Sequence, residues 1–150
     1  MTERVDFYVL AAAAPRLRST FACRLIAKAY LMDLSVVVWL DEPSAAKAVD
    51  DLLWTFDDRS FVPHRLCGEG AAMDPGTPVH LTAELDSVER ADLLINLSDR
   101  LPAGLDRFMR IAEIIDADPE RRRLGRERFK TYREHKLALE THQLGETAEI

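Results

Sequence analysis

The clearest chemical pattern lies near the C-terminus, in the segment RRRLGRERFKTYREHK. Residues 120–136 contain eight Lys or Arg and three Glu, a balance of +5, in a chain whose net charge is −6. The remaining residues therefore carry −11. An acidic protein with one basic segment is typical of a single surface that attracts anions.

If this segment is a helix, a rotation of about 100° per residue places five side chains within an arc of roughly 100°. These five residues, which we call the basic stripe, are Arg122, Arg126, Phe129, Lys130 and Arg133. Cations around one ring suit an acidic peptide that ends in an apolar side chain and a free carboxylate. Two alternatives stay open, a solvated helix face and a nucleic-acid surface, and the acidic remainder of the chain disfavours the second.

A second pattern is the aromatic segment LLWTFDDRSFVPHRLCGEG at residues 52–70. It gathers six apolar side chains into a stretch that we predict to be largely loop: Trp54, Phe56, Phe61, Val62, Pro63 and Leu66. Part of this set must belong to the core. Any aromatic rings that stay exposed on a rigid base are typical anchors of protein interfaces.

The usual catalytic patterns are missing from the sequence. The junction AAAAPRLRST lacks the glycines that let a backbone approach phosphate, although Arg16 and Arg18 lie close by. The four His and two Cys have no metal-ligand spacing, and Cys23 and Cys67 are expected to be free thiols. We therefore expect no enzyme activity, no cofactor and no metal.

The chain is expected to form one domain at residues 1–140, followed by a polar, frayed tail at residues 141–150. The predicted strands are Val5–Leu10, Ser35–Leu40, Val79–Leu81, Ala91–Leu97 and Arg110–Ile115, with a helix over residues 104–115 as a competitor to the last. The predicted helices run from Ser19 to Met32, from Pro43 or Ser44 to Phe56, and from Asp118-Pro119 to Leu139, while residues 57–78 are predicted to be loop. This order indicates a three-layer α/β/α, Rossmann-like domain with a mostly parallel sheet.

Composition points to a globular protein, with 47% hydrophobic and 31% charged residues. No stretch has the roughly 18 apolar residues that a membrane helix needs. The start MTERVDFYVL does not have the form of a signal peptide, and we expect a cytoplasmic protein.

The two patterned segments also carry a family resemblance. DLLWTFDDRSFVPHRLCGEG and LGRERFKTYR resemble the chi subunit of bacterial DNA polymerase III, and DFYVL, TPVHL and ADLLINL fall in matching order. The resemblance runs from about Asp6 to Arg133 and is weakest between Leu10 and Leu31. It implies an accessory subunit of the clamp loader that works in DNA replication, at the replisome on the nucleoid, and has no catalytic activity.

The resemblance also implies two protein partners, with DNA contacted only indirectly. The psi subunit would bind a surface with Trp54, Phe61, Pro63 and His64. The acidic C-terminal tail of single-stranded-DNA-binding protein (SSB) would bind the basic stripe, where Phe129 replaces a Tyr of some relatives and Arg122 a Lys. The alternatives are a nucleotide-binding α/β enzyme and a direct binder of single-stranded DNA.

Overall fold

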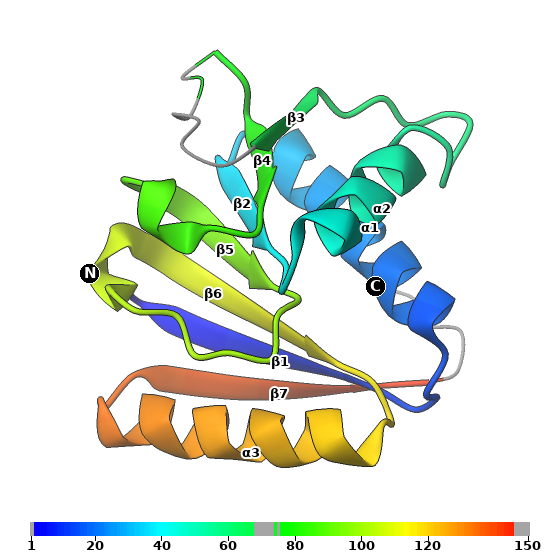
Figure 1. Cartoon of the computed structure of the whole chain (residues 1–150). Coiled ribbons are helices and arrows are strands. Elements are labelled where there is room, and N and C mark those ends of the chain that lie inside the picture. The colour runs from blue at the N-terminus through cyan, green and yellow to red at the C-terminus, as the bar shows by residue number, and fades with distance from the viewer. Residues whose placement is uncertain (1, 68–73, 75, 146–150) are drawn as a thin grey trace.

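The structure is a computed structural model that describes residues 2–67, 74 and 76–145 (Figure 1). Its strands are β1 (Arg4–Leu10), β2 (Val36–Trp39), β3 (His64–Cys67), β4 (Val79–Thr82), β5 (Ala91–Asn96), β6 (Phe108–Ile115) and β7 (Ala138–Leu144). Its α-helices are α1 (Pro15–Leu31), α2 (Pro43–Leu53) and α3 (Pro119–Glu134). Single 3₁₀ turns cover Leu85–Ser87 and Leu105–Arg107.

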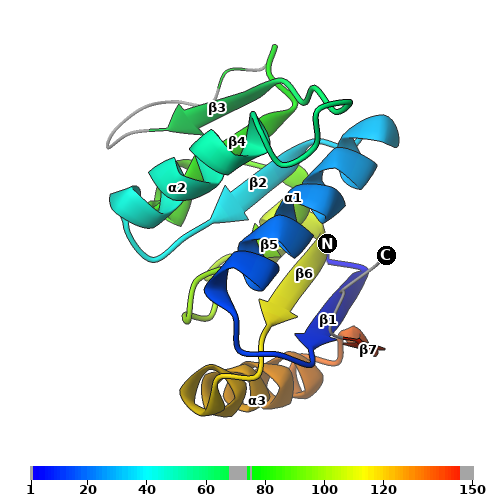
Figure 2. The ribbon, with the colours of Figure 1, turned by 90° about the vertical axis from the view of Figure 1, so that its right-hand side faces the viewer.

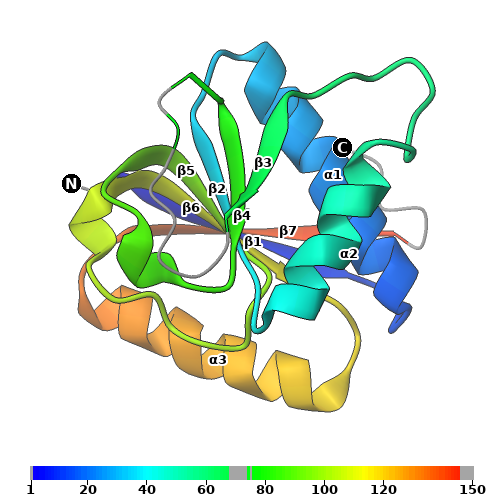
Figure 3. The same ribbon diagram turned by 45° about the horizontal axis from the view of Figure 1, so that its top comes forward.

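The strands form one seven-stranded sheet in the order β3-β4-β2-β5-β6-β1-β7, and its neighbouring strands run parallel. Helices α1 and α2 pack on one face of the sheet (Figure 2). Helix α3 packs on the other face, along the bottom of the views in Figures 1 and 3. The predicted three-layer, Rossmann-like fold is therefore confirmed.

Strand β2 shows how the sequence produces these layers. Its four residues VVVW are all buried, because a central parallel strand has helices or loops on both faces. Successive side chains of a strand point to opposite faces. Val36 and Val38 accordingly join the core beneath α1 and α2, whereas Val37 and Trp39 join the core on the side of α3.

The predicted start of the first helix was wrong. We expected a loop up to Arg18 and a cap at Ser19, but α1 begins at Pro15 with Ala14 as its N-cap. Proline is well tolerated in the first helical turn, where its missing N–H has no helical partner anyway. It marks the beginning of this helix rather than a break in the chain.

The expected loop over residues 57–78 contains the edge strand β3, which pairs in parallel with β4. Four residues between a proline and a glycine are too few to show a period, and tertiary pairing decides their conformation. Sequence signals for short strands are weak for this reason.

The C-terminal prediction was also wrong in part. Helix α3 ends at Glu134, Lys136 takes a left-handed conformation with φ 60°, and β7 then pairs with β1. Residues 141–144, which we expected in the frayed tail, belong to this strand, and residues 146–150 lie outside the described residues. Strand β6 replaces the competing helix over residues 104–115. No helix in the described ranges is long and apolar enough to span a membrane.

Candidate functional site

Helix α3 is fixed at its N-terminus and along its inner face. The carboxylate of Asp118, the predicted N-cap, accepts a hydrogen bond of 2.8 Å from the N–H of Arg121. A Cβ atom on Gly125 would lie 2.3 Å from Cδ1 of Ile115, so the glycine allows the helix to approach the end of β6 closely. The rotation of α3 about its own axis is therefore set by its contacts with the sheet.

A buried polar cluster below α3 fixes that rotation further. Nε and Nη2 of Arg128 each lie 3.1 Å from Oε1 of Glu113 in β6. The side chain of Arg128 is 4% exposed and that of Glu113 is 0% exposed. Tyr132 donates a hydrogen bond of 2.7 Å to Oε2 of Glu113, and the amide of Asn96 donates one of 3.0 Å. Burial raises the pKa of Glu113, although Arg128, Tyr132 and Asn96 stabilise its charged form.

Sequence reasoning did not find this cluster. Arg128 counted only as one more cation of the basic segment, yet it points into the protein. The available signal was Glu113 itself, a lone acid within the apolar strand FMRIAEII. A carboxylate at a position buried on both faces requires a cationic or hydrogen-bonding partner nearby.

The basic stripe lies along α3, and its members differ in burial. Arg126, Lys130 and Arg133 are exposed, whereas Arg122 and Phe129 are partly buried. The Phe129 ring packs edge-on to Phe7 of β1, with the ring centroids 5.2 Å apart and the planes at 61°. Leu137 and Leu139, which the stripe did not include, pack against the same core cluster as Phe129.

Arg122 is held by backbone carbonyl groups. Its guanidinium donates to the carbonyl oxygens of Asp116 and Leu10, both at 3.2 Å. It therefore lies at the carboxyl end of β1, and the exposed cations of the stripe lie further along the helix. The structure thus places three cations of the stripe fully at the surface and ties the fourth to the sheet.

The second candidate surface, which we call the aromatic surface, consists of Trp54, Phe61, Pro63 and His64. Trp54 is 49% exposed and Phe61 is 70% exposed, with their ring centroids 5.6 Å apart. The His64 ring lies 4.1 Å from Trp54, but its side chain is buried, and its Nε2 lies 3.2 Å from Oδ1 of Asp50. His64 therefore supports Trp54 from below, while Pro63 is partly exposed beside it.

An arginine occupies the carboxyl ends of the central strands, where related folds bind ligands. Arg18 of α1 donates to the carbonyl oxygens of Leu97, just after β5, and Ile114 in β6, at 2.9 and 3.0 Å. Burial lowers its pKa to about 10, and the charge of Arg121 lowers it too. Arg18 thus binds protein backbone at the place where the first β–α junction of a nucleotide-binding domain meets phosphate.

One group of potential metal ligands, Asp6, Glu140 and His142, lies across β1 and β7. The Asp6 carboxylate already accepts hydrogen bonds from Arg4 at 2.8 Å, Arg110 at 3.1 Å and His142 at 3.0 Å. Burial raises the pKa of Asp6, but these bonds outweigh it and hold the pKa below its usual value. Together with Arg4 and Arg110, the group forms a network of ion pairs and hydrogen bonds that joins β1, β6 and β7.

The fold and its two surfaces define a Rossmann-like α/β domain that presents a basic helix and an exposed aromatic cluster. Over residues 1–140 the sequence matches the family described as DNA polymerase III chi subunit, HolC. The chain belongs to this family, and the resemblance seen in the sequence is confirmed.

Named relatives agree with this assignment. DNA polymerase III subunit chi of Pseudomonas aeruginosa is 36% identical over 94% of this chain and 96% of its own length. The Haemophilus influenzae subunit is 30% identical over 97% of this chain and 100% of its own length. The Escherichia coli subunit is 30% identical over 74% of this chain and 75% of its own length. These relatives support the membership of the chain in the chi-subunit family.

Solved structures add only the fold. A structure of Saccharomyces cerevisiae Dbp5 bound to Nup159, Gle1, IP6 and ADP superimposes with a TM-score of 0.60 at 8% sequence identity. The match covers 93% of this chain but only 41% of that chain. This likeness confirms the α/β class.

Proposed function

We propose that this protein is a non-catalytic adaptor of the replisome. In this proposal the aromatic surface binds the psi subunit, which links the protein to the clamp loader. The basic stripe binds the acidic C-terminal tail of SSB, so that DNA is contacted only through that protein. The adaptor works in the cytoplasm, at the replisome on the nucleoid.

The main observation behind the proposal is that some cations of α3 pair with carboxylates and others do not. Arg121 and Arg123 form ion pairs with Asp116 and Glu120, and Arg128 is buried against Glu113. In the described part of the chain, by contrast, no carboxylate pairs with the three exposed cations of the stripe. Unpaired cations beside a half-buried ring support binding of a peptide that supplies carboxylates and an apolar terminal side chain.

The tail contact should be strongly salt dependent. We expect the affinity for a synthetic acidic SSB-tail peptide, measured by titration calorimetry, to fall about tenfold or more between about 0.05 and 0.3 M salt, because exposed charges are screened. An affinity that stays constant over this range would contradict the mechanism. Tight binding of a bare single-stranded oligonucleotide by the isolated protein would favour the direct DNA-binding alternative instead.

The aromatic surface supports a different contact, driven by apolar burial. Two exposed rings that lie 5.6 Å apart, with one supported by the buried His64, resemble the aromatic anchors of protein interfaces. Trp54 should lose little side-chain entropy when it is covered, because its ring already contacts the rings of His64 and Phe61.

Replacing Trp54 with Ala should weaken psi binding about thirtyfold, since buried aromatic anchors contribute about 2 kcal/mol or more. The affinity for the tail peptide should not change, because α3 lies on the opposite face of the sheet from α2. Both affinities can be measured on the same preparation by calorimetry. Equal psi affinities of Trp54→Ala and the wild type would remove Trp54 from the interface.

A further inference from the structure

The end of β7 lies beside the N-terminal part of α3. Leu144, the last residue of this edge strand, pairs with Leu10 of β1, and the guanidinium of Arg122 donates to the carbonyl oxygen of Leu10 at 3.2 Å. Figure 1 shows the carboxyl end of β7 and the first turns of α3 at the same end of the molecule. The chain therefore leaves the sheet next to one end of the basic stripe.

The stripe faces the side of α3 on which β7 lies. Arg128 points to β6, where it contacts Glu113, whereas Phe129 packs in the same core cluster as Leu139 of β7. At about 100° per residue, Lys130 lies a further step around the helix, away from β6. The exposed cations of the stripe are therefore accessible to a segment that comes from β7.

The sequence that follows β7 has the composition expected of a ligand for this surface. Residues 146–150 read ETAEI, with carboxylates at Glu146 and Glu149, no cation, and an apolar side chain at Ile150. The three exposed cations of the stripe have no carboxylate partner in the described part of the chain. Two carboxylates and one apolar side chain suit these cations and the partly buried ring of Phe129.

The length of the segment also fits the stripe. Residues 146–150 span at most about 17 Å when fully extended, and the stripe covers about 16 Å along α3. In an extended chain Glu146 and Glu149 lie about 10 Å apart, and the helical rise from Arg126 to Arg133 is about the same. Both carboxylates can therefore meet cations of the stripe at once.

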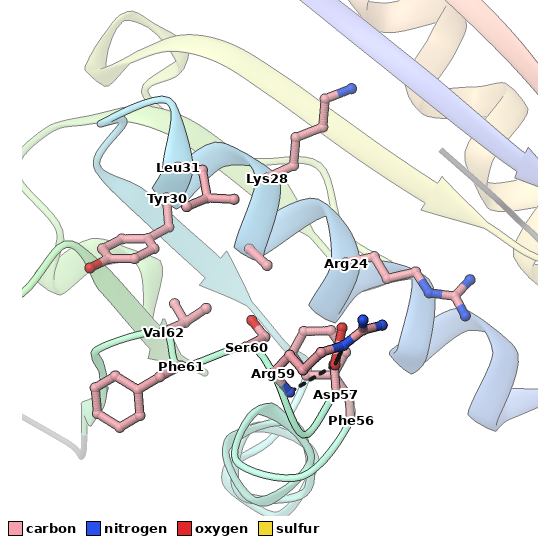
Figure 4. Close-up of a pocket in the computed structure, with 11 residues that line it drawn as sticks. Arg24, Lys28, Tyr30, Leu31, Phe56, Asp57, Arg59, Ser60, Phe61 and Val62 are labelled. Carbon is pink, nitrogen blue, oxygen red and sulfur yellow. Dashed lines mark hydrogen bonds and ion pairs between the residues drawn. The ribbon is translucent and has the colours of Figure 1, made fainter.

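A second surface with several cations offers a poorer match. A groove of about 920 Å³ lies between α1 and the loop at residues 56–62, and Figure 4 shows Arg24 and Lys28 pointing away from it. Arg59, which also lines the groove, lies 3.9 Å from the carboxylate of Asp57. An acidic segment is better matched by the basic stripe than by this groove.

We propose that residues 146–150 fold back onto the basic stripe of their own molecule, with their two carboxylates at the exposed cations and Ile150 beside Phe129. The contact is autoinhibitory, because an acidic peptide from a partner has to displace the segment before it binds α3. A segment that occupies the stripe for about two-thirds of the time lowers the apparent affinity for such a peptide about threefold. The competition with the SSB tail rests on the proposed function, whereas the intramolecular contact does not.

Paramagnetic NMR tests the contact by itself. A nitroxide attached to Thr147→Cys in the full chain should broaden the amide signals of residues 126–133 at about 0.05 M salt, and the broadening should largely disappear at about 0.5 M salt, because exposed charges are screened. The native thiols should stay unlabelled, since Cys23 and Cys67 are buried and burial raises the pKa of both.

Two results of this measurement would overturn the inference. One is an α3 whose amide signals are not broadened at low salt. The other is broadening that arises between molecules, which a mixture of spin-labelled protein and isotope-labelled wild type would reveal.

Calorimetry with a synthetic acidic SSB-tail peptide tests the competition. Glu146→Gln/Glu149→Gln should bind the peptide about threefold more tightly than the wild type at low salt, and the difference should shrink at high salt. The matched control is Asp58→Asn/Glu89→Gln, which changes the net charge equally at exposed positions outside the stripe. The control should bind the peptide like the wild type.

The outcomes separate this inference from the proposed function. If the wild type binds the peptide but Glu146→Gln/Glu149→Gln binds it no more tightly than the control does, the autoinhibition is wrong and the proposed function stands. If the nitroxide broadens the signals of α3 but no form of the protein binds the peptide, the intramolecular contact is supported and the proposed function fails.

Discussion

Replacing Arg128 with Ala is expected to lower the free energy of unfolding by about 3–5 kcal/mol, because the change leaves the fully buried Glu113 without its cation. Urea unfolding followed by circular dichroism measures this loss. The loss should be smaller near pH 4–5 than at pH 7. In the variant the pKa of Glu113 rises further above its unfolded value, and a buried acid with a raised pKa loses stability as the pH increases.

Arg126→Ala is the matched control, because Arg126 precedes Arg128 by two residues on the same helix but is exposed. It should change stability by less than about 0.5 kcal/mol. Glu113→Gln in the Arg128→Ala background should recover part of the loss, since an amide carries no charge to bury. If Arg128→Ala and Arg126→Ala had the same free energy of unfolding, the buried polar cluster around Glu113 would not anchor α3.

The second large effect concerns binding rather than folding. The double variant Arg126→Ala/Lys130→Ala should bind the acidic tail peptide about thirtyfold more weakly at low salt, because each exposed cation contributes about 1 kcal/mol. Titration calorimetry with the peptide provides the measurement. The affinity for psi should be that of the wild type, since neither residue lies near Trp54 or Phe61.

Lys47→Ala provides the control for this binding experiment. Lys47 is an exposed cation on α2 that pairs with Asp50 and Asp51, so its removal changes the net charge without touching the stripe. Peptide affinity should be unaffected. If Lys47→Ala lowered the affinity for the peptide as much as a single substitution in the basic stripe does, general charge attraction would explain the contact and a defined pocket would not.

The sequence was sufficient where local pattern and tertiary contacts agree. The run SVVVWL predicted β2, and the pair Asp118-Pro119 predicted the start of α3, because burial on both faces and helix capping each leave a direct signature. It failed at β3 and β7, which are edge strands defined by pairing with β4 and β1. Pairing between residues distant in sequence cannot be seen in a window of a few residues.

For the candidate surfaces, too, the local pattern predicted exposure on a helix but not the contacts that form between distant segments. Helical periodicity placed Arg126, Lys130 and Arg133 on one face, and all three are exposed. Periodicity could not show that His64 is buried under Trp54 or that Arg122 donates to backbone carbonyls. Those contacts depend on how the loop and the sheet fold back onto the elements that carry the two residues.

The strand order separates the two surfaces. The aromatic surface adjoins β3 at one edge of the sheet, and α3 packs against β6 and β7 at the other. Six strand spacings of about 4.8 Å put these edges roughly 30 Å apart. In the proposed function, two ligands at these edges do not collide, so one molecule holds both at once and keeps each partner at a high local concentration near the other, without altering the intrinsic affinity for either.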